Sequence, residues 1–391
     1  MKRTGYLDGL RGLAAFAVML SHIEPLLVSA VTGTYAPSGM FAYTFYMLTS
    51  GSLAVAVFFM LSGFVLVLSY DKHEGHALAN GAAKRYFRLA PPIVASMILT
   101  YILANTVGYY SIPAAELMGG HNWLSLQSPG ELSFGRALVD GFTAPFLGSN
   151  PHNGVLWTMN IEFWGGLGLF GVASLFYKSK LYWLFVISFS ALAVYIVGVN
   201  GMHFSLFLFG SLLLKYRQSW SSSKFAILIP FGLLLGVVRP WHGVMQSLQS
   251  FFMYSEGMAF NVQIALNSLG GALIVIAVVL SPSCQKILSK NTFKYLGELS
   301  FSLYLVHLPI FLTIGCFTFI KLEWLGLNLA AAGAALITIA TSLIISDLLF
   351  RTADRFSVYL SNLVGRQVIG SFGAGKTETA ATSDVQPALV Q

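Results

Sequence analysis

Residues 48–70 read LTSGSLAVAVFFMLSGFVLVLSY and contain no Asp, Glu, Lys, Arg or His. About 20 consecutive apolar residues are enough for a helix to cross the hydrocarbon core of a bilayer. An uncharged run of this length therefore predicts a transmembrane helix. The rest of the chain has the same character.

The composition agrees with a membrane protein. Of the 391 residues only 9% are charged and 56% are hydrophobic, and the mean hydropathy is +0.72, whereas ordinary soluble domains have about 25% charged residues. This deficit excludes a soluble enzyme, a secreted disulfide scaffold and a disordered protein. A net charge of +7 in a membrane protein more often reports topology than nucleic-acid binding, so we expect no nucleic acid. Cys284 and Cys316 have no metal-ligand spacing, so we expect no metal.

Ten segments meet or approach the length of a membrane span. They predict an all-α polytopic protein with about ten transmembrane helices, and the short sixth and seventh segments leave a range of about eight to eleven. The predicted spans are 8–29, 48–70, 89–110, 154–177, 181–199, 202–215, 225–239, 259–281, 297–320 and 325–350.

The basic residues test this count independently. If the N-terminus is cytoplasmic, the inside segments hold 18 of the 22 Lys and Arg residues, and the outside loops hold only Arg136, Arg239 and Lys321. The remaining one, Arg11, lies at the inner end of the first span. Lys and Arg accumulate in cytoplasmic loops, so the split predicts that both termini are cytoplasmic.

The segments outside the predicted membrane spans divide the chain into a membrane domain and a tail. Residues 1–352 are expected to form one membrane domain, and residues 353–391 a cytoplasmic tail that is disordered beyond about 367, because it lacks periodicity and is rich in small and polar residues. Residues 71–88 form a basic inside loop. We expect no appended soluble catalytic domain.

The longest outside segment, residues 111–153, is the expected outer contributor to a substrate site. It carries His121, Trp123 and His152. Aromatic residues at this level of a membrane protein also serve as interface anchors, so the composition leaves both interpretations open.

Arg11 and His22 lie eleven residues apart on the first predicted span. Eleven residues are close to three helical turns, so the two side chains project from nearly the same face, roughly 16 Å apart along the axis. This spacing places a fixed charge at the cytoplasmic end and an imidazole, which exchanges protons near neutral pH, in the outer half of the bilayer. An ionisable residue inside a membrane indicates a functional site by default.

Two further ionisable residues lie at membrane depth. Glu162 on the fourth span is expected at about the depth of His22, roughly 12 Å in, and His307 on the ninth span near mid-membrane. A histidine and a carboxylate at one depth could form an oriented base. Each of the three could instead be a structural hydrogen-bonding residue between helices.

The inside loop ends in RYFR, residues 85–88. Arg85 and Arg88 share a face if this stretch is helical, and paired guanidinium groups suit phosphate recognition. The alternative is topological anchoring and contact with anionic lipids, which lysines could also supply.

Five short motifs together resemble acyltransferase family 3, a family of integral membrane O-acyltransferases. The last two depart slightly from the family pattern, with Met159 where Leu is usual and Phe301 where Tyr is usual. The motifs are YLDGLRGLAA (6–15) followed by His22, FFMLSGF (58–64), RYFR (85–88), LWTMNIE (156–162) and GELSFSLYLVHLP (297–309).

The resemblance implies ten membrane helices and transfer of an acyl group, commonly acetyl, from cytoplasmic acyl-CoA to a hydroxyl of a carbohydrate or glycolipid acceptor. Many family members modify cell-envelope polysaccharides, lipopolysaccharide or peptidoglycan, which implies the bacterial inner membrane. Acyl-CoA would be a donor substrate and no cofactor would be permanently bound. Apart from membrane lipid, the implied partners are the donor, the acceptor and, for any second transfer, a separate periplasmic transferase.

Under this resemblance we expect His22 to be the general base on the acceptor hydroxyl, with Glu162 or His307 orienting or relaying. A covalent acyl-histidine is the variant. The expected binding residues are Arg11, Arg85 and Arg88 for the phosphates of the donor, and Ser62, Trp157 and Tyr304 for substrate.

The main alternative is a secondary transporter or an exporter of a lipid-linked saccharide. It explains ten spans and buried ionisable groups equally well. Transporters often carry matching interrupted helices in two halves of the chain, and the sequence does not show them.

Overall fold

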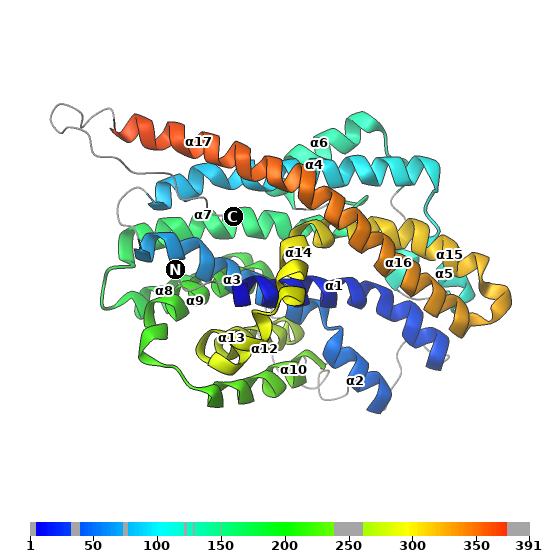
Figure 1. Cartoon of the computed structure of the whole chain (residues 1–391), viewed down its shortest axis with the longest axis horizontal. Helices are drawn as coiled ribbons and strands as arrows, with labels where there is room; N and C mark the ends of the chain where they lie inside the picture. The colour runs from blue at the N-terminus through cyan, green and yellow to red at the C-terminus, as the bar shows by residue number, and fades with distance from the viewer. Residues whose placement is uncertain are drawn as a thin grey trace.

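The computed structural model describes residues 5–32, 40–72, 77–120, 123–127, 130–148, 150–237 and 261–373. Within these ranges the secondary structure is helical and contains no strand, which confirms the all-α fold. Figure 1 shows the longer helices lying side by side in one bundle. The longer helices are α1 (Gly5–Thr32), α3 (Gly51–Lys72), α4 (Ala77–Thr106), α7 (Trp157–Phe176), α8 (Tyr182–Val197), α9 (Val199–Tyr216), α12 (Val262–Leu280), α14 (Asn291–Ile310), α16 (Leu327–Leu349) and α17 (Arg355–Gly373).

Shorter helices connect and cover these rods. The α-helical ones are α2 (Met40–Leu48), α5 (Ser111–Leu117), α6 (Phe134–Leu147), α10 (Leu228–Val237), α13 (Pro282–Leu288) and α15 (Cys316–Lys321). The 3₁₀ turns are η1 (Trp123–Leu126), η2 (Gly154–Leu156), η3 (Arg217–Ser219), η4 (Ser223–Ile227) and η6 (Glu323–Leu325), and the π-helical turns are η5 (Phe311–Gly315) and η7 (Phe350–Asp354).

Seven of the described helical segments are long and apolar enough to cross a membrane, so the protein is a multi-pass membrane protein. All ten predicted spans fall on helices. The three that are not among the seven are α8, α9 and α10, of which α8 and the η4–α10 segment are shorter apolar helices. The count of ten and the cytoplasmic termini stay predictions.

Helices α1 and α14 approach each other closely because glycines face each other at their contact. A β-carbon on Gly12 would meet the backbone nitrogen of Gly297 at 2.5 Å, and one on Gly297 would collide with the backbone of Asp8. Small residues of this kind are what allow membrane helices to pack backbone to backbone. The two helices run in the same direction, since contacts advance along both chains together.

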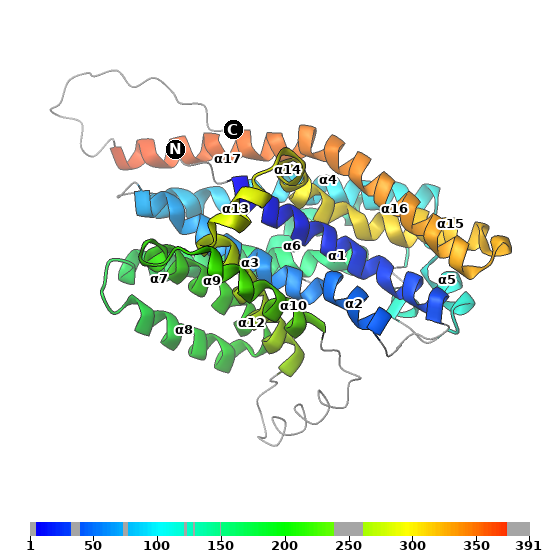
Figure 2. The same ribbon diagram turned by 60° about the horizontal axis from the view of Figure 1, so that its bottom comes forward.

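Helices α16, η7 and α17 form one continuous rod from Leu327 to Gly373, roughly 70 Å long at 1.5 Å per residue. The hydrocarbon core is only about 30 Å thick, so this rod is more than twice as long as a helix needs to be to cross it. Helix α4 is also longer than its predicted span and includes residues 77–88, the second part of the expected inside loop. In both views α17 runs alongside α4 (Figure 1, Figure 2).

The expected tail therefore begins as helix. Helix α17 continues to Gly373, past the point near 367 where order was expected to end, and residues 374–391 lie outside the described residues. The proposed boundary at 352 stays a prediction, but α17 packs on α4 as part of the bundle.

Candidate functional site

His22 and His307 lie in contact where α1 and α14 run side by side. His307 Nε2 lies 3.2 Å from His22 Nδ1, and the ring centroids are 5.0 Å apart. Each histidine is ten residues beyond the glycine at which its helix touches the other, Gly12 on α1 and Gly297 on α14. Equal offsets on helices running in the same direction place both rings at one height. His307 is therefore level with His22, whereas its position in the predicted span had suggested that it lies deeper.

The backbone determines which ring nitrogens carry hydrogen. His22 Nδ1 lies 2.8 Å from the carbonyl of Val18, and His307 Nδ1 lies 2.9 Å from the carbonyl of Leu303. A carbonyl only accepts, so both Nδ1 atoms donate and both Nε2 atoms are unprotonated in the neutral rings. The single Nδ1–H of His22 is then shared between two acceptors, the Val18 carbonyl and His307 Nε2. Of the two unprotonated nitrogens, His22 Nε2 is the one that does not accept from the other ring.

The two rings differ in accessibility. His307 is completely buried, whereas His22 is only half-buried. Trp123, in η1 of the outside segment, packs against His22 with the ring centroids 5.3 Å apart. His22 is therefore the more exposed of the two residues, and the segment of residues 111–153 reaches its ring through Trp123. His121, the other residue expected beside Trp123, lies outside the described residues.

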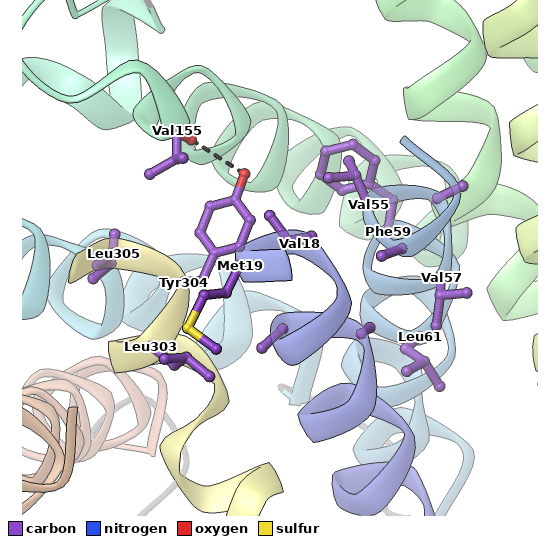
Figure 3. Close-up of a cluster of buried hydrophobic side chains, with 14 of the residues drawn as sticks. Val18, Met19, Val55, Val57, Phe59, Leu61, Val155, Leu303, Tyr304 and Leu305 are labelled. Carbon is purple, nitrogen blue, oxygen red and sulfur yellow. Dashed lines mark hydrogen bonds between the residues drawn. The ribbon is translucent and has the colours of Figure 1, made fainter. Parts of the chain in front are cut away.

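A compact core surrounds the histidine pair, meaning His22 and His307, on its inner side. Tyr304 of α14 packs against Val18 and Met19 of α1 and its hydroxyl donates to the carbonyl of Val155 at 3.3 Å, as Figure 3 shows. The same hydroxyl lies 3.0 Å from the Thr158 hydroxyl. Tyr304 was expected to bind substrate; the structure places its hydroxyl in a buried junction between α14 and the start of α7.

Glu162 does not face either histidine. Its Oε1 accepts from Arg85 Nη2 at 2.8 Å and from the Ser62 hydroxyl at 2.9 Å, while Arg85 Nε and Nη2 both donate to the backbone carbonyl of Glu162. The Arg85 side chain is 9% exposed and that of Glu162 18%. This buried cluster, the Glu162 cluster, ties α3, α4 and α7 together and satisfies a charge that would otherwise be costly in a membrane.

A glycine one turn beyond Glu162 makes room for Arg85. A β-carbon at Gly166 would meet Arg85 Nε at 2.5 Å and its Cζ at 2.7 Å. The guanidinium therefore lies flat on the backbone of α7. Arg85 was expected to hold phosphate, and here its donors serve a carboxylate and a carbonyl.

Arg88 lies on the same side of α4 but is more accessible. Its Nη1 donates to Asp354 Oδ1 and to the Ser357 hydroxyl, both at 2.6 Å, and its guanidinium stacks over the ring of Phe301 at 5.6 Å. The Arg88 side chain remains 38% exposed, whereas Asp354 is 7% exposed. Of the two arginines, Arg88 is the one with room for a further anionic ligand.

Of the remaining expected residues, Arg11 and Trp157 have other partners, and Ser62 belongs to the Glu162 cluster. Arg11 forms an exposed contact of 3.6 Å with Asp8 on its own helix and, as expected, sits three turns below His22. Trp157 packs against His203, with the ring centroids 5.4 Å apart, and near Phe59. Ser62 is occupied by Glu162.

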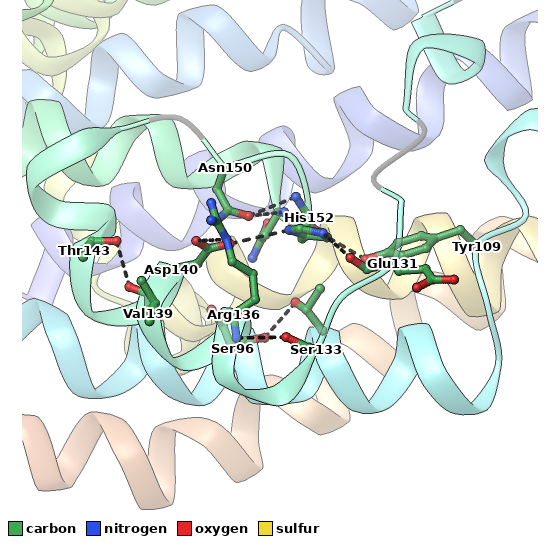
Figure 4. A network of polar contacts seen from close by, with 12 residues as sticks. Ser96, Tyr109, Glu131, Ser133, Arg136, Val139, Asp140, Thr143, Asn150 and His152 are labelled. Atoms are coloured by element: carbon green, nitrogen blue, oxygen red, sulfur yellow. Dashed lines mark hydrogen bonds and ion pairs between the residues drawn. The ribbon is translucent and has the colours of Figure 1, made fainter.

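The outer segment is held by a polar network, drawn in Figure 4. Asp140 pairs with Arg136 at 2.7 Å and lies 3.5 Å from His152 Nδ1, while the Asn150 side chain accepts from the backbone N–H of His152. Tyr109 donates to the carbonyl of His152. His152 thus connects the segment before η2 to α6 and to the residues just after α4.

Sequence reasoning missed Asp354, Ser357 and Thr158. Thr158 lies inside the motif LWTMNIE (156–162). Its place between Trp157 and Glu162, two expected site residues, could have marked it as a candidate. Asp354 is the single acid between residues 348 and 373, and its pairing with Arg88, 266 positions earlier, depends on the path of α17. In the described part of the chain no cluster of metal-binding side chains is found.

Comparison with known proteins agrees with this arrangement. Residues 4–349 match the family model for acyltransferase family 3, described as an acyltransferase domain. A curated relative, acyltransferase MdmB of Streptomyces mycarofaciens, is 30% identical over 117 residues, which is 30% of this chain and 27% of that protein. The match thus spans about a quarter of the length of the relative. No solved structure matches the chain.

The family match covers the histidine pair, the Glu162 cluster and Arg88, and it ends just before η7 and α17. Together with the bundle of apolar helices, it gives the family and the membrane fold. The chain belongs to acyltransferase family 3 and is a multi-pass membrane protein.

Proposed function

We propose that the protein transfers an acyl group, with acetyl as the first candidate, from cytoplasmic acyl-CoA to a hydroxyl of a cell-envelope carbohydrate or glycolipid in the bacterial inner membrane. The observation that carries the proposal is the contact of His22 with His307, in which both Nδ1 atoms are held by helix carbonyls. This geometry leaves one unprotonated nitrogen, His22 Nε2, on the ring that packs against Trp123.

The chemistry assigned to His22 is general-base catalysis. Its Nε2 takes the proton of the acceptor hydroxyl as the oxygen attacks the thioester carbonyl. The carbon–sulfur bond then breaks, the acyl group stays on the acceptor oxygen, and the CoA thiolate takes the proton back from His22. His307 Nε2, 3.2 Å from His22 Nδ1, accepts a hydrogen bond that stabilises the transient imidazolium.

A covalent acyl-histidine route uses the same nitrogen. His22 Nε2 would attack the thioester carbonyl, the carbon–sulfur bond would break and CoA would leave as the thiolate. The acceptor hydroxyl would then attack the acyl-imidazolium, which releases neutral His22, and its proton would pass to the CoA thiolate. In that route His307 stabilises the acyl-imidazolium in the same way. Rapid mixing in the absence of acceptor separates the two routes, because only the covalent route gives a burst of CoA release.

The donor is assigned to the cytoplasmic side, where Arg88 has an accessible guanidinium. We assign Arg85 and Glu162 to holding the helices around the donor, since their polar atoms already serve each other. Arg11 lies roughly 16 Å below His22 on the same helix, a separation that suits the long thiol arm of CoA.

The acceptor is assigned to the outer side, where Trp123 contacts His22. Stacking of an aromatic ring on a sugar face is compatible with a carbohydrate acceptor. Trp157 is 37% exposed and is a second candidate for such contact. A separate periplasmic transferase would be needed for any later transfer outside the membrane.

The test uses the purified full chain and labelled acetyl-CoA, with release of CoA and labelled product as readouts. His22→Ala should lower the rate about 10²- to 10⁴-fold. Ser21→Ala is the matched control, because the Ser21 hydroxyl donates to the same Val18 carbonyl as His22 and should leave the rate unchanged. A correctly inserted His22→Ala protein with the full rate would refute the assignment, and saccharide flux without acyl transfer would favour the exporter.

A further inference from the structure

A row of cations follows the contact between α4 and α17, the two helices that extend furthest beyond the expected membrane core. It begins at Arg88, which is bound to Asp354 and Ser357. One turn earlier on α4, Lys84 Nζ donates to Asn362 Oδ1 of α17 at 3.1 Å. The two helices run side by side along this stretch (Figure 2).

Arg366 continues the row on α17. It is exposed, and it lies close enough to Lys84 for the two positive charges to repel each other. A β-carbon at Gly365 would collide with the Lys84 side chain, so this glycine allows α17 to come near Lys84. The fold therefore brings two cations together at this position.

No carboxylate among the described residues forms an ion pair with either of these two charges. Within the described ranges, the ion pairs with carboxylates include Arg88 but neither Lys84 nor Arg366. Residues 355–373 contain no Asp or Glu. Two like charges held together in this way are destabilising on their own, and a bound anion would reverse the sign of the interaction.

The length of the row indicates what kind of anion fits. Ser357, opposite Arg88, and Arg366 are nine residues apart on α17, roughly 14 Å along its axis. This is longer than one phosphate group and suits a ligand that carries phosphates at two places, as the head of CoA does. Arginine and lysine donors of this kind make strong charge-assisted bonds to phosphate oxygens.

The row also leads to the reaction centre. Arg88 stacks over Phe301 of α14, and His307 lies six residues further along that helix, roughly 9 Å. A ligand whose phosphates lie along α17 would have its arm directed from Arg88 along α14 to the histidine pair.

We propose that α17 forms part of the binding site for the donor's phosphate groups, with Lys84 and Arg366 as phosphate ligands in addition to Arg88. This rests on the proposed use of acyl-CoA as donor. Since the family match ends at residue 349, the assignment adds to the site a helix that lies beyond the matched domain. Asp354, at the end of the π-helical turn η7, aligns this helix with Arg88.

The test measures binding of CoA itself to the full chain in a neutral detergent, without turnover. The double variant Lys84→Ala plus Arg366→Ala should raise the Kd for CoA about tenfold or more and reduce its salt dependence. The matched control is Lys286→Ala plus Lys290→Ala on and beside α13, which removes the same charge from two exposed positions and should leave Kd unchanged. An unchanged Kd in the first variant, or an equal loss in both, would overturn the proposal.

A second measurement separates the two sources of phosphate. Vesicles of neutral lipid, with and without added phosphatidylglycerol, report whether the same residues hold a lipid headgroup. If the Lys84 and Arg366 substitutions weaken association with phosphatidylglycerol but not with CoA, the donor assignment is wrong. If CoA binding falls as expected in a protein that shows no acyl transfer, this site stands and the proposed reaction fails.

Discussion

The histidine pair and the Glu162 cluster hold polar groups in the same bundle by opposite means. His22 and His307 are held by carbonyls of their own helices and by each other. Arg85 is held by a carboxylate from another helix. The first arrangement leaves a nitrogen free to take a proton, whereas in the second the Glu162 carboxylate is paired with a permanent positive charge.

This difference corresponds to two tasks. A general base must change its charge during the reaction, so a permanent counter-ion would hold it in one state. A helix junction benefits from a charge that never changes, and arginine remains protonated in proteins. We therefore assign proton transfer to the histidines and helix positioning to Arg85 and Glu162.

The largest effect should come from breaking the Glu162 cluster. Removing one partner of a buried ion pair leaves an uncompensated charge, so Glu162→Leu should lower the free energy of unfolding by about 3–5 kcal/mol. Arg85→Met in the same chain should recover most of this loss, because both charges are then absent. Thermal unfolding of the purified protein measures both.

Ser62→Ala is the control for that experiment. It removes one hydrogen bond to Glu162 while the ion pair stays intact, so its cost should be smaller, about 1.5–3 kcal/mol. If Glu162→Leu alone were as stable as the natural protein, the cluster would not hold the helices, and a direct catalytic role for Glu162 would become the better explanation.

Sequence patterns predicted most of the fold but only part of the site. Apolar length predicted the helices, because this property depends on the bilayer and not on tertiary contacts. The partners of Glu162 depended on which helices are neighbours, and a shared depth with His22 was not sufficient to predict them. Arg85, 77 positions away in the chain, became its partner through the packing of α4 on α7.

The contact between the histidines shows the same limit. Counting residues from the span ends placed His307 deeper than His22. The close approach of α1 and α14 at Gly12 and Gly297 sets the actual register. The glycines were visible in the sequence, but their pairing across 285 positions was not.

A smaller effect should come from His307, which assists His22 without meeting substrate. His307→Leu removes the acceptor next to His22 Nδ1 and should lower kcat about tenfold, or about 1.4 kcal/mol, with little change in the KM for the donor. His307→Gln offers a side-chain carbonyl and should retain more activity than Leu. In a His22→Ala background neither substitution should reduce the residual rate further. Additive losses would show that His307 acts on its own.

The smallest effect should come from Asp354, the partner of Arg88, and it tests whether Arg88 binds donor while the buried Arg85 only holds helices together. Asp354→Asn weakens the charge that orients Arg88 and should raise the KM for acyl-CoA about threefold, or about 0.7 kcal/mol, while kcat stays unchanged. The chain provides a matched control in Asp347→Asn, since Asp347 pairs with Arg351 at the same distance of 2.6 Å on the exposed side of α16 and should leave both constants unchanged. Equal KM values for the two variants would place Arg88 with Arg85, as a residue that holds helices together and does not bind donor.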